Sequence, residues 1–153
     1  MKLVDVKTWA VATPPPHRGG LSWVFLKLTT DDGLSGYGEA YGVPFSPQKV
    51  CLMIEDVVER YVLGQSPFNI ETIWRILYAS GYSHHPELTM GGIMSGIEIA
   101  CWDIVGKALN QPVYNLLGGQ VNERLRSYTY LYPPEPSEDK SQYDASLDTT
   151  HYH

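Results

Sequence analysis

The segment MGGIMSGIEIACWDIVGKALNQPVYNLLGG (90–119) contains the longest helical pattern in the chain. Its apolar residues recur every three or four positions, which predicts a helix over about 89–109. Gly92 and Gly96 interrupt this pattern, although a glycine costs a helix about 1 kcal/mol relative to alanine. That cost is tolerable where another element packs directly on the helix backbone, so we expect a close neighbour here. The apolar stripe comprises Ile93, Ile97, Ala100, Cys101, Ile104 and Ala108.

Shorter helices are predicted on both sides of this one. Ser46 followed by Pro47 is typical of an N-cap with proline at the first helical position, and Gly64 ends that helix. Asn69 is the predicted cap of a second helix. Beyond the long helix, Gln111-Pro112 begins a short fourth helix that Gly118-Gly119 stops.

The residues before these helices predict strands. The segments LVDVKTWAVA (3–12), SWVFLKLTT (22–30) and LSGYGEAYG (34–42) are rich in β-branched, aromatic or alternating residues. The DDG segment (31–33) supplies hairpin-turn chemistry between the second and third strands. The glycines of 34–42 suggest that another backbone approaches closely. Three sequential strands with short connections predict an antiparallel sheet.

A further strand is predicted after the helices, at RLRSYTYLY (124–132), where polar and apolar residues alternate. No partner strand follows it, because PPEPSEDK (133–140) is an acidic, proline-rich linker. Strands first and helices afterwards indicate an α+β fold. The isolated fourth strand does not fit a self-contained α+β domain.

Composition limits the classes of function. The chain has 153 residues, of which 43% are hydrophobic and 18% charged, as in a globular domain with one core. A net charge of −6 with scattered basic residues argues against nucleic acid as a partner. No run approaches the roughly 18 apolar residues of a membrane span, and the N-terminus is no signal-peptide core. We expect a soluble, cytoplasmic protein whose two cysteines are buried free thiols.

The acidic residues do not form a recognisable catalytic set. Glu55, Asp56 and Glu59 fall on the polar face of the first helix, which indicates a solvated surface. Asp103 and Lys107 are spaced i, i+4, so an intrahelical ion pair or a hydrogen bond to a neighbouring loop is expected. No Cys or His lies at zinc spacing. The residues by themselves predict no complete active site.

Two segments are candidate ligand loops. His17 and Arg18 lie between three prolines and two glycines, and a mobile loop with a cation and an imidazole suits an anionic ligand. An ordinary exposed hairpin loop is the alternative. Tyr82, His84 and His85 precede the long helix and are candidates for substrate binding.

The segments VFLKLTTDDGLSGYGEA (24–40), MGGIMSGIEIACWDIVGKALNQPVYNLLGG (90–119) and LRSYTY (125–130) resemble the mandelate racemase/muconate lactonizing branch of the enolase superfamily. The chain looks most like the acid-sugar dehydratases. The resemblance implies an N-terminal α+β capping domain over 1–123. It also implies that 124–153 holds the first strand of a TIM-type (β/α) barrel and the following loop. Such a barrel takes about 250 residues, so we expect most of it to be absent from this chain.

The resemblance also implies a chemistry that depends on the barrel. Family members bind Mg²⁺ through carboxylates on later barrel strands, and their bases lie there too, so this chain supplies no catalytic and no metal residue. The loops 13–21 and 41–47 resemble the two family loops that close over the barrel. The implied substrate-binding residues are His17, Arg18, Tyr41, Phe45, His84 and Tyr130.

The implied whole protein is a lyase that removes the proton α to a carboxylate and eliminates water. A racemase or cycloisomerase of the same superfamily is one alternative. A non-catalytic fragment or binding module is the other, and we expect the 153-residue chain alone to be inactive. The implied partners are an acid-sugar substrate, the remaining barrel polypeptide and further copies of the chain in a homo-oligomer.

Overall fold

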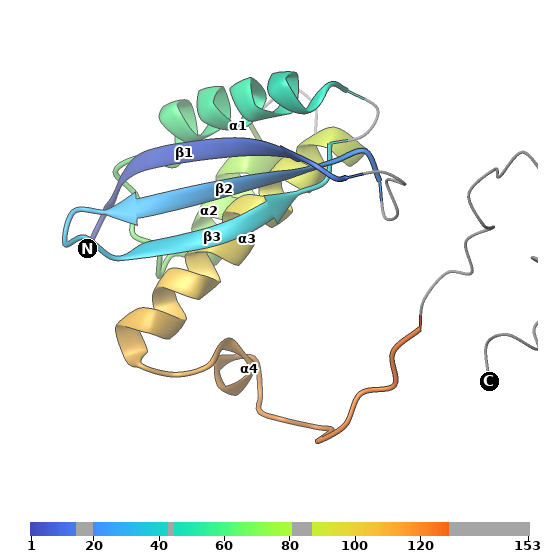
Figure 1. The fold of residues 1–153 in the computed structure, drawn as a ribbon. Helices are drawn as coiled ribbons and strands as arrows, with labels where there is room; N and C mark the ends of the chain where they lie inside the picture. The colour runs from blue at the N-terminus through green and yellow to red at the C-terminus, as the bar shows by residue number, and fades with distance from the viewer. Residues whose placement is uncertain (15–19, 43–44, 81–86, 129–153) are drawn as a thin grey trace, which may run out of the picture.

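The computed structural model describes residues 1–14, 20–42, 45–80 and 87–128, and it forms a three-stranded antiparallel sheet followed by four helices (Figure 1). The strands are β1 (Leu3–Ala12), β2 (Ser22–Thr30) and β3 (Ser35–Ala40), in the order β1-β2-β3. The predicted antiparallel sheet is confirmed. β3 is shorter than the predicted segment 34–42, since it ends at Ala40.

The two faces of the sheet differ as the alternation of residues requires. Val24, Leu26 and Leu28 of β2 point to the buried face. Trp9 of β1 and Tyr37 of β3 lie on the opposite face, where their rings stack with centroids 6.4 Å apart. The sheet therefore contributes one face to the core, and no helix of the described residues covers the other face (Figure 1).

The helices cover the buried face of the sheet (Figure 1). α1 (Pro47–Tyr61) packs on β1 and β2, α3 (Leu88–Leu109) packs on β3 and β2, and α2 (Ile70–Tyr78) packs on α3. The short α4 (Val113–Leu116) follows and contacts α3. This arrangement of sheet and helices is the α+β fold that the order of elements predicts.

α3 is the central core helix. Its 22 residues are long and apolar enough to cross a membrane by length and composition alone, but 56% of the apolar window is buried inside the fold. The buried residues include Ile93, Ile97 and Ile104, which belong to the predicted apolar stripe. The hydrophobic character of α3 is accounted for by its packing within the domain.

The expected close neighbour of α3 is β3. A Cβ atom added to Gly38 would lie 1.9 Å from the carbonyl oxygen of Gly96, and one added to Gly36 would lie 2.1 Å from that of Ala100. Any side chain would therefore collide with the helix backbone. The glycines of β3 and α3 allow strand and helix to approach more closely than side chains would permit.

The predicted N-cap residues stand at the predicted positions, but they do not make the hydrogen bonds that usually define a cap. Ser46 and Asn69 do precede α1 and α2, yet neither side chain accepts a capping hydrogen bond. α3 is capped by Glu87, whose side chain accepts from the amides of Thr89 and Met90. At the other end Asn110 takes the left-handed conformation with φ of 50°.

The predicted strand at 124–132 is not seen where the structure describes it. Residues 124–128 form neither helix nor strand, and 129–132 lie outside the described residues. The physical reason is that alternation fits a strand locally, whereas a strand also needs a neighbour to complete its backbone hydrogen bonds. None of the described strands β1, β2 and β3 pairs with this segment. The boundary between 1–123 and 124–153 stays a prediction.

Candidate functional site

A cavity of about 730 Å³ lies where β2 begins, β3 ends and α1 begins. Tyr41 and Phe45, two of the predicted substrate-binding residues, both line it, and their side chains are 57% and 50% exposed. Trp23 lies beside them on β2. The structure therefore brings two of the predicted residues together at one end of the sheet. The complete lining consists of Gly20, Leu21, Ser22, Trp23, Val24, Glu39, Ala40, Tyr41, Gly42, Phe45, Ser46, Pro47 and Val50.

Backbone hydrogen bonds shape the walls of this cavity. The amide of Phe45 donates to the carbonyl of Gly42 at 3.0 Å, which turns the chain between β3 and α1. On the facing side, the amide of Thr13 donates to the carbonyl of Leu21 at 3.1 Å and extends the pairing of β1 with β2. These two bonds place Leu21, Gly42 and Phe45 at the ends of the strands, where ligand sites are often found.

The other predicted site residues cannot be placed. His17, Arg18, His84 and Tyr130 lie outside the described residues, as do Tyr82 and His85. Their roles stay predictions.

The described lining of the cavity is mainly apolar. Its described walls are mainly aromatic, aliphatic and glycine residues, with Ser22, Glu39 and Ser46 as further polar side chains. None of these three belongs to a nucleophile–base pair among the hydrogen bonds of the described residues. An aromatic lining with few polar groups is typical of a ligand pocket in which a few contacts set orientation.

The structure adds Trp23, Leu21 and Glu39 to the predicted lining. A sequence signal existed for Trp23, because alternation in 22–30 places it on the face opposite Val24, beside the loop 13–21. On β3, the exposed Glu39 alternates in the same way with its buried neighbours Gly38 and Ala40. That these residues meet Tyr41 and Phe45 depends on strand register, which pairs Val24 with Ala40.

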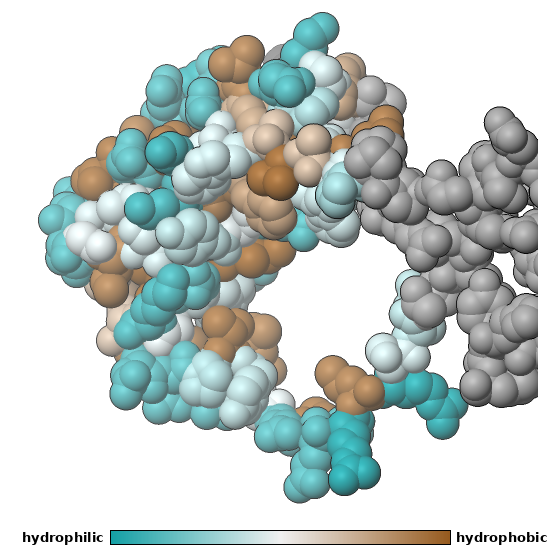
Figure 2. All heavy atoms as spheres, in the orientation of Figure 1, coloured by the Kyte–Doolittle hydropathy of each residue, from teal (hydrophilic) through white to brown (hydrophobic). Residues whose placement is uncertain are grey.

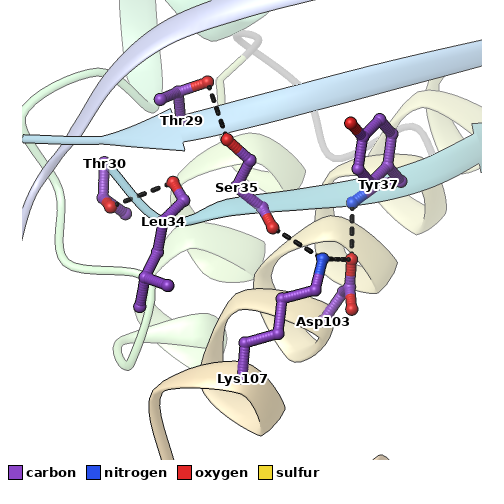
Figure 3. A network of polar contacts seen from close by, with 7 residues as sticks. All are labelled: Thr29, Thr30, Leu34, Ser35, Tyr37, Asp103 and Lys107. Atoms are coloured by element: carbon purple, nitrogen blue, oxygen red, sulfur yellow. Dashed lines mark hydrogen bonds and ion pairs between the residues drawn. The ribbon is translucent and has the colours of Figure 1, made fainter. Parts of the chain in front are cut away.

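Away from the cavity, a cluster of polar side chains and backbone groups joins α3 to β3 (Figure 3). Lys107 Nζ lies 2.7 Å from Asp103 Oδ2, which confirms the expected intrahelical ion pair. Asp103 Oδ2 also accepts from the amide of Tyr37 at 2.9 Å, and Lys107 Nζ donates to the carbonyl of Ser35 at 2.7 Å. These contacts connect two residues of β3 with two residues of α3. We call this cluster of Ser35, Tyr37, Asp103 and Lys107 the helix–strand joint, and its role is structural.

Two carboxylates of α1 are also engaged in structural contacts. Glu55 accepts from the Thr8 hydroxyl at 2.5 Å, and Asp56 lies 3.6 Å from Arg60. Across the described residues, no group of three His, Cys, Asp or Glu side chains could hold a metal ion. The Mg²⁺ site that the resemblance implies lies on later barrel strands, outside this chain, and stays a prediction.

Three comparisons place these features among known proteins. The model of the mandelate racemase / muconate lactonizing enzyme N-terminal domain matches residues 5–118. D-galactonate dehydratase from Klebsiella pneumoniae (strain 342) is 36% identical over 138 residues, which are 90% of this chain and 33% of that protein.

Two solved structures are similar in fold as well as in sequence. A Burkholderia SAR-1 protein assigned to mandelate racemase/muconate lactonizing enzymes is 53% identical with a TM-score of 0.85, covering 89% of this chain and 34% of that one. A mandelate racemase/muconate lactonizing enzyme from Sulfitobacter sp. is 45% identical with a TM-score of 0.85, covering 97% and 39%. The chain spans between about a third and two fifths of the length of these relatives.

Proposed function

The chain belongs to the mandelate racemase / muconate lactonizing enzyme family, and we propose that it is the capping domain of a Mg²⁺-dependent acid-sugar dehydratase. The observation that carries the proposal is the cavity between β2, β3 and α1, in which Tyr41 and Phe45 come together. The identity of 36% to a D-galactonate dehydratase supports a sugar acid as the substrate class.

The reaction would remove the proton α to the substrate carboxylate and expel the β-hydroxyl as water. Such a proton is very weakly acidic, so a divalent cation on the carboxylate oxygens is needed to stabilise the negative charge that develops. The described residues hold no group that could bind this cation. We therefore assign the metal and the bases to the barrel polypeptide and assign no chemical step to this chain.

The role of this chain would be to close the substrate site. Aromatic rings such as those of Tyr41 and Phe45 can pack on the C–H faces of a sugar acid and exclude water around it. His17 and Arg18 would face the anionic substrate, while His84 and Tyr130 would supply further polar contacts. The proposal makes these six residues determinants of specificity.

The outward side of α3 is where we propose that the barrel polypeptide packs. A second cavity of about 480 Å³ lies there, between the end of β3 and the helix, with Tyr41, Leu88 and Ile99 in its lining. Figure 2 shows apolar residues on both sides of the open space between the helices and the segment after α4. Val121 and Leu125 in that segment are 90% and 82% exposed. A partner in this space would cover both apolar surfaces.

The test combines this chain with the polypeptide that completes the barrel. With Mg²⁺ and a panel of aldonic and aldaric acids, we expect a 2-keto-3-deoxy acid from at least one substrate. If no member of the panel loses water, the dehydratase proposal fails. Exchange of the α-proton with solvent deuterium, seen by NMR without loss of water, would instead assign a racemase or cycloisomerase.

The 153-residue chain alone is expected to be inactive. The reason is the absence of a metal-binding group among the described residues. The measurement is turnover of the same substrate panel by the isolated chain in the presence and absence of Mg²⁺. Mg²⁺-dependent turnover by the isolated chain would contradict the assignment of the metal to the barrel.

A further inference from the structure

The backbone at Tyr41 and Gly42 is held by two contacts that leave no room for a methyl group. A Cβ atom added to Gly92 of α3 would lie 1.9 Å from the carbonyl oxygen of Tyr41. A Cβ atom added to Gly42 would lie 2.4 Å and 2.7 Å from the two methyl carbons of Val50 of α1. Real Cβ atoms essentially never approach neighbours closer than 3.0 Å. The segment therefore lies against both helices.

The contact at Gly92 is specific to that position in α3. Gly91 precedes it in the same helix, and a Cβ atom added there would meet nothing within 4 Å. Both glycines weaken the helix by a similar amount, about 1 kcal/mol relative to alanine. Only Gly92 compensates for this cost by allowing the carbonyl of Tyr41 to approach.

The same segment forms one wall of the candidate substrate cavity. Tyr41 and Gly42 both line it, and the hydrogen bond from the Phe45 amide to the Gly42 carbonyl links Phe45 to this position. A methyl group on Gly92 would require the Tyr41 carbonyl to move by about 1 Å to restore a 3.0 Å contact. Displacements of about that size can strongly weaken binding and catalysis.

We propose that Gly92 and Gly42 are positioning residues that set the place of Tyr41 and Phe45 in the substrate cavity. Gly92 acts through the backbone of Tyr41, and Gly42 acts through its contact with Val50. The part of this inference that concerns substrate rests on the proposed function, whereas the part that concerns backbone position does not.

The backbone part is tested by amide hydrogen exchange, measured by mass spectrometry on the chain as isolated. We expect Gly92→Ala to accelerate exchange about tenfold or more in peptides containing Tyr41 and Gly42, because the displaced segment loses its packing. Gly91→Ala is the matched control and should leave these peptides at the wild-type rate. Equal exchange in the two variants would overturn the proposal.

A second pair of variants keeps the test decisive if Gly92→Ala fails to fold. Gly42→Ala collides with the Val50 side chain, so Val50→Ala should relieve most of that collision by removing both methyl carbons and leaving only the Val50 Cβ, at 3.0 Å. We expect Gly42→Ala to accelerate exchange in the Tyr41 peptides, and the double variant to return to the rate of Val50→Ala alone. No acceleration in Gly42→Ala, or no rescue in the double variant, would contradict the positioning role of Gly42.

The substrate part is tested in the assembled enzyme by steady-state kinetics. We expect Gly42→Ala to raise KM about tenfold with kcat nearly unchanged, and the double variant to have the KM of Val50→Ala alone. A purely structural defect would lower the active fraction and therefore kcat at constant KM. Absence of wild-type turnover would count against the proposed function, whereas a normal KM in Gly42→Ala would count against this inference.

Discussion

Glu87 is the residue that starts the central helix. Its carboxylate accepts hydrogen bonds from the amides of Met90 and Thr89, the latter at 3.0 Å, and these bonds hold the pKa of Glu87 below its ordinary value of 4.5. The first amides of a helix have no partner within the helix, so a side chain that accepts from two of them stabilises the start of α3. A negative charge at this end is also favourable for the helix dipole.

We predict that the stabilisation by Glu87 depends on pH. Because the folded pKa is lowered, the contribution is complete above the unfolded pKa and is lost as pH falls through the folded pKa. The difference in free energy of unfolding between wild type and Glu87→Gln should therefore shrink from about pH 6 to about pH 3. Urea titrations followed by circular dichroism across that range would measure it. A difference that stays constant over that range would refute the prediction.

The two cysteines differ in reactivity because they differ in burial. Burial and, to a smaller extent, the nearby Glu98 carboxylate together raise the pKa of the Cys101 thiol to about 12. Cys51 is only half-buried. Since the thiolate is the reactive form, Cys101 is expected to be inert in the folded chain.

A thiol titration with Ellman's reagent at about pH 8 would test this expectation. The folded wild type should react at Cys51 only, and Cys101 should react after denaturation. The variant Cys51→Ser is the control and should show no reaction in the folded state. Rapid reaction of that variant would mean that Cys101 is accessible.

At the scale of elements, the contact between β3 and α3 organises the domain. Glycines bring the two backbones together, and the cluster of Ser35, Tyr37, Asp103 and Lys107 joins them at one end (Figure 3). Asp103 satisfies an amide on the edge of the sheet that no neighbouring strand pairs among the described residues. The joint therefore combines close packing with polar bonds that define the register of helix against strand.

We predict that Asp103→Ala lowers the free energy of unfolding by about 1–2 kcal/mol, because it removes the bond to Tyr37 as well as the ion pair. Asp103→Asn should cost about 0.5 kcal/mol, since it loses the charge but keeps an acceptor. Chemical denaturation would provide both values, provided that the slopes of the transitions agree.

The control for this prediction is another i, i+4 ion pair. Glu71 and Arg75 lie 4.0 Å apart, and their side chains are 87% and 79% exposed. This ion pair lies within α2 and does not link that helix to the sheet. Glu71→Ala should therefore change stability by less than about 0.5 kcal/mol. If Asp103→Ala were no more destabilising than Glu71→Ala, the joint would contribute nothing beyond a surface ion pair.

At the scale of the whole molecule, apolar surface is exposed on the side of the helices that no described element covers. Leu88 and Ile99 on α3, Leu117 after α4, and Val121 and Leu125 beyond it are all exposed. Exposed apolar side chains that gather on one side of a domain often mark an interface. This pattern agrees with the proposal that a barrel polypeptide packs against α3.

We predict that the chain alone self-associates or binds a hydrophobic dye, and that adding the barrel polypeptide abolishes both effects. Analytical ultracentrifugation and dye fluorescence would measure them. The variant Ile99→Gln should reduce self-association, whereas the exposed polar control Glu71→Gln should not. A monodisperse monomer of 17.2 kDa that unfolds cooperatively would contradict the expected role of this surface.

The local patterns of the chain were sufficient to predict its elements. Alternation located β1, and β-branched and aromatic residues located β2, at their observed bounds, and helical periodicity located α3 to within one residue of its start. The glycines of β3 and α3 correctly indicated a close backbone approach. These predictions succeeded because strand and helix periods, glycine conformational freedom and i, i+4 spacing are properties of neighbouring residues.

The make-up of the candidate site depended on contacts between residues that are distant in the sequence. Only folding shows that Trp23 and Glu39 share a cavity with Tyr41 and Phe45, or that Gly92 lies under the Tyr41 carbonyl while Gly91 meets nothing. The alternation at 124–128 likewise predicted a strand that the structure does not form there. The reason is physical: a local pattern specifies which face of an element is apolar, whereas register, packing and a hydrogen-bonding neighbour decide what that face meets.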